Sequence, residues 1–206
     1  MTSARAQTTA GRAFDSPAVP AVPRPEVVPR FPDLRGIERF AGHVIHTARW
    51  DQDYDMAHER VAVIGTGASA IARIPELVKR ARSVEVFQRT PAWVLPRFGY
   101  RLPEWAAAWH RAPLHPGLET AIRAHLRLAV RDPWLRRQLT PSFRAGCSRL
   151  HFSDDYYPAL QSERCKLITW PIATLVPKGV RTADGIERWF DCIVFATGVD
   201  RAAAAF

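Results

Sequence analysis

The chain has 206 residues, enough for one domain of ordinary size with a buried core. Its three cysteines form no C-x-x-C pair, which argues against a disulfide framework or a zinc ribbon, and we expect no metal site. The formal net charge is +9, but the basic residues are mostly arginines scattered along the chain, so no nucleic-acid-binding surface is indicated.

Targeting and membrane signals are also missing from the sequence. There is no run of about 18 apolar residues, and the first residues lack the apolar stretch of a secretory signal. We therefore expect a cytoplasmic protein with no membrane partner. Residues 1–30 combine Ala, Thr, Ser and repeated prolines without an apolar period, and we expect them to be extended or disordered.

The first strong element begins at Arg60, after a segment 31–59 that we interpret as a linker. RVAVIG is a short apolar run ending in glycine, which predicts a buried parallel strand. A helix follows in IARIPELVKRA, where Pro75 must kink the helix or mark its first turn, and VEVFQ predicts a second strand. A βαβ unit of this length predicts an α/β fold with a Rossmann-like parallel sheet.

The remainder of the expected Rossmann domain, residues 60–200, contains two further regions. Residues 104–140 predict a small helical insertion, in which Asp132 is an N-cap and Pro133 the first helical residue. After Pro141 the runs CKLIT, IATLV and GVRT, with a turn at Asp184-Gly185, predict a β-meander that leads into the last buried strand, in IERWFDCIVFAT. We expect residues 201–206 to be a tail.

A dinucleotide fingerprint of the form G-x-G-x-x-A lies between the first strand and the helix. Gly65 permits the tight turn, Gly67 lets a pyrophosphate approach the backbone, and Ala70 allows close helix packing. The expected cofactor-binding residues of this turn are Gly65, Thr66, Gly67, Ala68, Ser69 and Ala70. A glycine turn of another kind of α/β protein is the alternative.

The residues after the second strand select the nucleotide. An acidic side chain there would hold a ribose hydroxyl, but this chain has Gln88-Arg89-Thr90. A hydrogen bond from Arg89 to a 2′-phosphate is worth roughly 1.5–3 kcal/mol, or about a ten- to a hundredfold preference for NADPH over NADH. The pattern disfavours FAD at this turn. A solvated arginine at a strand end is the alternative.

The segment Phe40–Asp51 carries a second motif. By itself His46 reads as a hydrogen-bonded structural histidine, and His43-x-x-His46 lacks further metal ligands nearby. The segment resembles F-x-G-x-x-x-H-x-x-x-W-[P/D], the signature of Baeyer–Villiger monooxygenases, residue for residue. Further similar segments are VAVIGTGASA, VFQRTPAWVLPR, SDDYYPAL and DCIVFATG, in the order of that family.

The resemblance implies an enzyme in which NADPH reduces FAD, and dioxygen is then used to oxygenate a ketone or a heteroatom. It implies that Gly65, Gly67 and Ala70 hold the pyrophosphate, and that Arg89 and Thr90 hold the 2′-phosphate. His46 would couple domain movement to catalysis.

The family's Cys/Thr-Lys-Arg segment falls on Cys147-Ser148-Arg149. Arg149 matches the arginine that stabilises the negatively charged peroxyflavin. Ser148 departs from the pattern, because a lysine there normally adds a second contact to the 2′-phosphate, and this puts the strength of the NADPH preference in doubt.

The family's own fingerprint for FAD has no counterpart in residues 1–59. We therefore expect a fragment of such an enzyme, one that binds NADP(H) weakly or needs a complementing FAD-domain chain. The alternatives are a non-catalytic NADP(H)-binding module and an inactive gene fragment. A reductase that passes hydride directly to its substrate is disfavoured, because Tyr156 and Tyr157 lack a lysine at the Tyr-x-x-x-Lys spacing, and we expect both to be packing residues beside the turn before Pro158.

Overall fold

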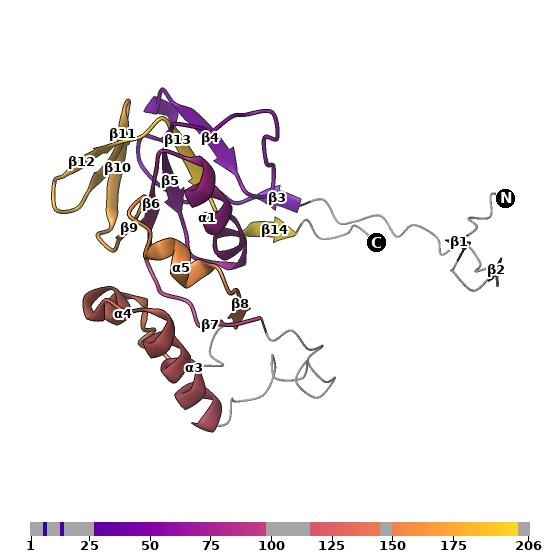
Figure 1. The fold of residues 1–206 in the computed structure, drawn as a ribbon. Helices are drawn as coiled ribbons and strands as arrows, with labels where there is room; N and C mark the ends of the chain where they lie inside the picture. Colours follow the sequence, from indigo (N-terminus) through magenta and orange to yellow (C-terminus); the bar gives the residue numbers. More distant parts are fainter. Residues whose placement is uncertain (1–5, 8–12, 15–26, 98–115, 145–149, 202–206) are drawn as a thin grey trace.

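The computed structural model describes residues 6–7, 13–14, 27–97, 116–144 and 150–201. At its centre is a fully parallel sheet of five strands in the order β4-β13-β5-β6-β9 (Figure 1). These strands are β4 (His43–His46), β5 (Arg60–Ile64), β6 (Ser83–Phe87), β9 (Cys165–Ile168) and β13 (Cys192–Phe195). The expected α/β fold with a parallel sheet is confirmed. None of the helices in the described part is long and apolar enough to cross a membrane.

The βαβ unit predicted from residue 60 onwards is present as β5, α1 (Ala68–Arg80) and β6. The helix buries the face that carries Ile71, Ile74 and Leu77. Pro75 was expected either to kink this helix or to mark its first turn. It lies in the interior of α1, so the first-turn alternative is wrong. Because proline has no N–H, the carbonyl of Ile71 loses its usual helical partner there.

The sheet is covered differently on its two faces. Alternate residues of a strand point to opposite faces, so Val61 and Val63 pack in the cluster that contains α1 and α5 (Tyr156–Leu160). Ala62 and Ile64 pack in the other cluster, which contains the apolar residues of the meander. Each buried valine or isoleucine stabilises the fold by about 1.5–3 kcal/mol, and this burial explains the continuous apolar run of the sequence.

Two helices of the expected insertion are described, α3 (Pro116–Ala129) and α4 (Pro133–Leu139); residues 98–115 lie outside the described part. The predicted start of α4 is confirmed, because Asp132 Oδ1 accepts a hydrogen bond of 2.9 Å from the backbone N–H of Trp134 and Pro133 is the first helical residue. Tyr156 and Tyr157 are buried, which confirms them as packing residues. They belong to α5, however, and this short helix includes Pro158, so the expected turn before it was wrong.

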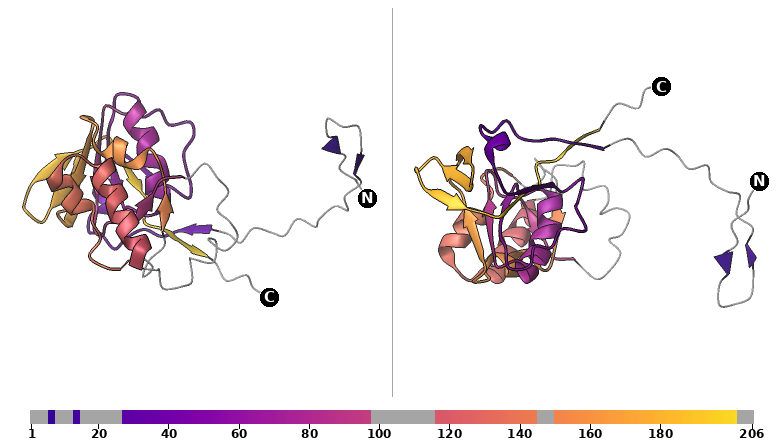
Figure 2. Two further views of the ribbon diagram at one scale, coloured as in Figure 1. Left: turned by 60° about the horizontal axis from the view of Figure 1, so that its bottom comes forward. Right: turned by 90° about the horizontal axis from the view of Figure 1, so that it is seen from above.

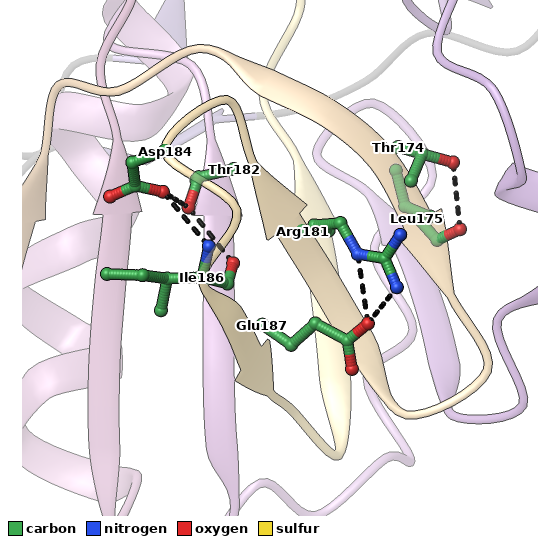
Figure 3. Close-up of polar contacts among 7 residues, drawn as sticks. All are labelled: Thr174, Leu175, Arg181, Thr182, Asp184, Ile186 and Glu187. Carbon is green, nitrogen blue, oxygen red and sulfur yellow. Dashed lines mark hydrogen bonds and ion pairs between the residues drawn. The ribbon is translucent and has the colours of Figure 1, made fainter.

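The predicted β-meander is formed by β10 (Ile172–Val176), β11 (Gly179–Thr182) and β12 (Glu187–Trp189). The turn between β11 and β12 is closed by Asp184, whose carboxylate accepts hydrogen bonds from the Thr182 hydroxyl and the Ile186 N–H (Figure 3). These bonds hold the pKa of Asp184 below its ordinary value. The run CKLIT, expected next to this meander, instead supplies β9 at the edge of the parallel sheet.

The short elements complete the fold. Strands β3 (Val27–Pro29) and β14 (Val199–Arg201) pair antiparallel and leave the sheet together on one side (Figure 2). The other short elements are β1 (Ala6–Gln7), β2 (Ala13–Phe14), η1 (Ile37–Arg39), β7 (Val94–Leu95) and β8 (His151–Phe152). The extended or disordered segment expected at residues 1–30 and the tail expected at 201–206 lie mostly outside the described residues. Within the described part, β3 pairs with β14, so regular structure begins before residue 31 and continues to residue 201.

The segment 31–59, interpreted as a linker, is structurally part of the domain. It contributes β4, which pairs in parallel with β13 at one edge of the sheet. Ile45 is buried in the same cluster as α1. The division at residue 60 therefore does not correspond to a boundary in the sheet, because β4 can satisfy its backbone hydrogen bonds only by pairing with a strand near the end of the chain.

Candidate functional site

The carboxyl ends of the five parallel strands meet at one edge of the sheet. The fingerprint turn follows β5 there, the Gln88-Arg89-Thr90 segment follows β6, and His46 ends β4. In open α/β sheets ligands bind at this edge, beyond the ends of the strands. The fold therefore brings together three segments that the sequence predicted separately.

Gly65 has a backbone conformation that requires glycine. Its φ is +116°, and a Cβ atom would lie 2.5 Å from the carbonyl oxygen of Ala196. That oxygen cannot move easily, because the Ala196 N–H donates to the Ile64 carbonyl at 2.9 Å. The Ala-Thr-Gly segment at residues 196–198, which follows β13, thus packs directly against the fingerprint turn. This contact was not predicted from the sequence.

The next part of the turn is open to solvent. Gly67, Ala68 and Ser69 are exposed, and a Cβ atom added to Gly67 would have no neighbour within 4 Å. Gly67 is the N-cap of α1 and makes no side-chain cap, so the first N–H groups of this helix face outward without an intrahelical partner. Ala70, in contrast, is fully buried against the sheet. This arrangement suits an anionic group placed on the helix N-terminus.

A hydrogen bond connects the fingerprint turn to the second predicted segment. The hydroxyl of the buried Thr66 donates to the carbonyl of Thr90 at 2.7 Å, and the Gly65 N–H donates to the Phe87 carbonyl at 3.2 Å. Arg89 and Thr90 are exposed next to this contact. Within the described part of the chain, the Arg89 side chain has no hydrogen bond or ion pair, which leaves its guanidinium available for an external anion.

Gln88 is a further residue of this edge, which the sequence analysis did not single out. Its side chain is buried, and Nε2 donates to the Gln138 carbonyl at 2.9 Å, in the last turn of α4. The side-chain oxygens of both glutamines are buried and have no hydrogen-bond partner among the described residues. Helix α4 is thereby attached to the strand end that carries Arg89. The one signal for this role in the sequence is a polar residue directly after an apolar strand.

His46 is buried where the antiparallel pair of strands β3 and β14, called here the β3–β14 ribbon, leaves the sheet. Its Nδ1 accepts the Ala48 N–H at 3.1 Å, so the neutral ring carries its proton on Nε2. Nε2 lies toward the carbonyls of Arg30 and Gly198 but does not reach hydrogen-bond geometry with either. Burial lowers the pKa of His46. These contacts agree with a structural histidine, and they also place it where β3 and β14 meet the sheet.

The remaining residues of the motif contact their surroundings as structural groups. His43 Nε2 lies 3.2 Å from Asp51 Oδ2, and its ring stacks on Tyr54 with centroids 3.8 Å apart. The Trp50 ring lies 4.5 Å from the guanidinium carbon of Arg73, one turn along α1 from the fingerprint. In the described ranges no three His, Cys, Asp or Glu residues are grouped as metal ligands.

Arg149, the second expected catalytic residue, lies outside the described residues, as do Cys147 and Ser148. A hollow of about 380 Å³ between α4, α5 and β9 contains none of the predicted site residues. We place the candidate site at the carboxyl edge and not in this hollow, because the edge combines exposed glycine backbone, a helix N-terminus and an exposed arginine.

Comparison with known proteins assigns the family. Residues 18–147 match the family model described as flavin-binding monooxygenase-like. The chain is 37% identical over 197 residues to a Baeyer-Villiger monooxygenase of Streptomyces coelicolor, covering 82% of this chain and 38% of the relative. It is 38% identical over 199 residues to one of Pseudomonas aeruginosa, covering 82% and 37%. The chain thus spans well under half the length of these relatives.

Solved structures show the same fold. The OTEMO complex with FAD and NADP superimposes with a TM-score of 0.71 at 26% identity, covering 86% of this chain and 46% of that one. Cyclohexanone monooxygenase with bound epsilon-caprolactone gives a TM-score of 0.73 at 25% identity, covering 86% and 47%. Because the matched family model covers well over half of its residues, the chain belongs to the flavin-binding monooxygenase-like family.

Proposed function

We propose that this chain forms the NADP(H)-binding part of an FAD- and NADPH-dependent monooxygenase of the Baeyer–Villiger type. The observation that carries the proposal is the open N-terminus of α1 beside the exposed Arg89, which has no ion pair with any described residue. Curated relatives named Baeyer-Villiger monooxygenase and a neighbour solved with FAD and NADP support it. Because the chain spans well under half of these relatives, we propose the activity for a protein that also contains the rest of their sequence.

The described residues fit a dinucleotide phosphate. The backbone N–H groups of Ala68, Ser69 and Ala70 would receive the pyrophosphate at the start of α1, where Gly67 leaves space for it. Thr66 would hold the turn in place through Thr90, and Arg89 would bind the 2′-phosphate. No carboxylate ends β6, so a ribose hydroxyl has no acceptor there, and NADP(H) fits this turn better than FAD or NAD(H).

FAD, when bound to the complete enzyme and reduced by NADPH, would supply the electrons with which one oxygen atom of dioxygen is inserted into a substrate. We propose a ketone or a heteroatom compound as that substrate, in line with the relatives' names and with the caprolactone complex. His46, fixed by Ala48, would position the β3–β14 ribbon relative to the sheet, and thereby affect catalysis without touching the reacting atoms. For Arg149 we keep the role of stabilising negative charge next to the flavin.

The nucleotide preference gives a direct test. NADPH, NADH and FAD are titrated into the chain and into an Arg89→Ala variant, and binding is followed by calorimetry. Loss of one charge-assisted hydrogen bond to the 2′-phosphate should weaken NADPH binding about tenfold and leave NADH binding within about twofold. Arg164→Ala, which removes another exposed arginine, is the matched control and should bind NADPH like the original chain.

Two results would contradict the assignment. If Arg89→Ala weakens NADPH and NADH equally, Arg89 does not recognise the 2′-phosphate. If FAD binds this turn more tightly than NADPH, the fingerprint belongs to the flavin. Turnover of NADPH by the chain with added FAD and oxygen would show that it needs no further chain.

A further inference from the structure

A groove between α3 and α4 is lined by four arginines. They are Arg123 and Arg127 on α3 and Arg136 and Arg137 on α4, and the hollow between them measures about 210 Å³. Of the described residues that line it, none is acidic. Four guanidinium groups around one small hollow repel each other, so an anion bound between them would be favoured.

Two of the four arginines are held in position by the protein. Arg123 is paired with Glu119 at 2.8 Å and lies 5.0 Å over the Trp93 ring, while Arg136 Nη1 donates to the Arg127 carbonyl at 3.3 Å. Arg127 and Arg137 are exposed, and their side chains have no hydrogen bond or ion pair among the described residues. The four arginines and Glu119, counted among the described residues alone, give 4 − 1 = 3 positive charges in excess. Part of the site is therefore preorganised, and part is free to bind.

None of the described residues that line the groove belongs to the proposed cofactor site. Residues three or four apart share a face of a helix, and Leu135 and Leu139 turn the core-facing side of α4 toward the sheet. Arg136 and Arg137 lie on the other side, toward α3. Arg89 is therefore not part of a site at this position.

We propose that the α3–α4 groove binds a small oxyanion with more than one negative charge, of the phosphate class. Guanidinium groups donate paired hydrogen bonds that match the oxygens of a phosphate, whereas a chloride ion offers a single acceptor atom and a single negative charge. The hollow is smaller than the roughly 300–1,000 Å³ of sites for drug-sized ligands, which favours a single phosphate group over a whole nucleotide.

Thermal unfolding of the complete chain tests the proposal, with inorganic phosphate as the probe. A ligand that binds the folded state raises the unfolding temperature. At matched ionic strength, sodium phosphate should raise it more than sodium chloride, both in the original chain and in Arg164→Gln. In the double variant Arg127→Gln/Arg137→Gln, about three- to tenfold more phosphate should be needed for the same rise, since each exposed charge contributes modestly.

Further arms separate free phosphate from the phosphates of a nucleotide. With saturating NADPH present, inorganic phosphate should still raise the unfolding temperature, because the two sites are separate. The proposal is overturned if the double variant responds to phosphate like the original chain, or if chloride has the same effect as phosphate. It is also overturned if NADPH or Arg89→Ala abolishes the response, because phosphate would then occupy the cofactor site.

Discussion

The same substitution to alanine should lower stability at the first glycine of the fingerprint turn and cofactor binding at the second. In Gly65→Ala the new Cβ atom would lie 2.5 Å from the Ala196 carbonyl oxygen, at a φ of +116°. Strained backbone of this kind costs about 1–3 kcal/mol, and overpacking against fixed atoms costs about 1–3 kcal/mol more. The expected loss in the free energy of unfolding is therefore about 2–6 kcal/mol, a large part of a typical total of about 5–15 kcal/mol.

Gly67→Ala should leave stability almost unchanged. The added Cβ atom meets nothing within 4 Å, and φ is −79°, a value that alanine adopts readily. Alanine is the poorer N-cap but reduces the entropy of the unfolded chain, and these effects of about 0.5–1 kcal/mol oppose each other. The methyl group would instead occupy the space proposed for the pyrophosphate, so NADPH binding should weaken about tenfold or more.

Urea unfolding measures the stability of both variants, and an NADPH titration measures their binding. If Gly65→Ala unfolds at the same urea concentration as the original chain, Gly65 is not fixed against Ala196 as described. If Gly67→Ala stays folded and keeps full NADPH affinity, the pyrophosphate does not bind next to Gly67. Because the two substitutions add the same methyl group two residues apart, each serves as the control for the other.

Two pH-dependent predictions follow from the charges around the sheet. Burial lowers the pKa of His46 below its ordinary 6.5, so the unfolded chain binds more protons and the free energy of unfolding falls as pH drops below about 6.5. His46→Gln should reduce this fall between about pH 7.5 and about pH 5.5, while His125, whose pKa is also lowered by burial, keeps part of it. An unchanged pH dependence of the free energy of unfolding in His46→Gln would contradict this prediction. Arg60 lowers the pKa of Asp191 to about 2, so this stabilisation is present above the ordinary 3.8 and is lost as pH falls through about 2. Asp191→Asn should cost about 1 kcal/mol at neutral pH after solvent screening, and urea unfolding should show the difference from the original chain vanish below about pH 2.

Patterns within short stretches of sequence predicted much of this protein correctly. The run RVAVIG, the glycine turn and the helix after it required only local periodicity and the conformational freedom of glycine, and the structure confirms the strand and the helix. The start of α4 at Asp132-Pro133 was predictable for the same reason, because capping is decided by neighbouring residues. The family followed from motifs whose order along the chain is visible without a structure.

Contacts between distant segments were decided only by the tertiary structure. No local pattern shows that β4 and β13 pair, 149 positions apart at His43 and Cys192, or that Ala196 presses on Gly65. The same holds for the link from Gln88 to α4 and for the groove that collects arginines from two helices. Strand pairing and side-chain packing depend on which surfaces the whole chain buries together, whereas turns and caps depend on a few adjacent residues. For this reason the sequence alone determined the individual strands, turns and helices. Their assembly into a site was decided only by the tertiary structure.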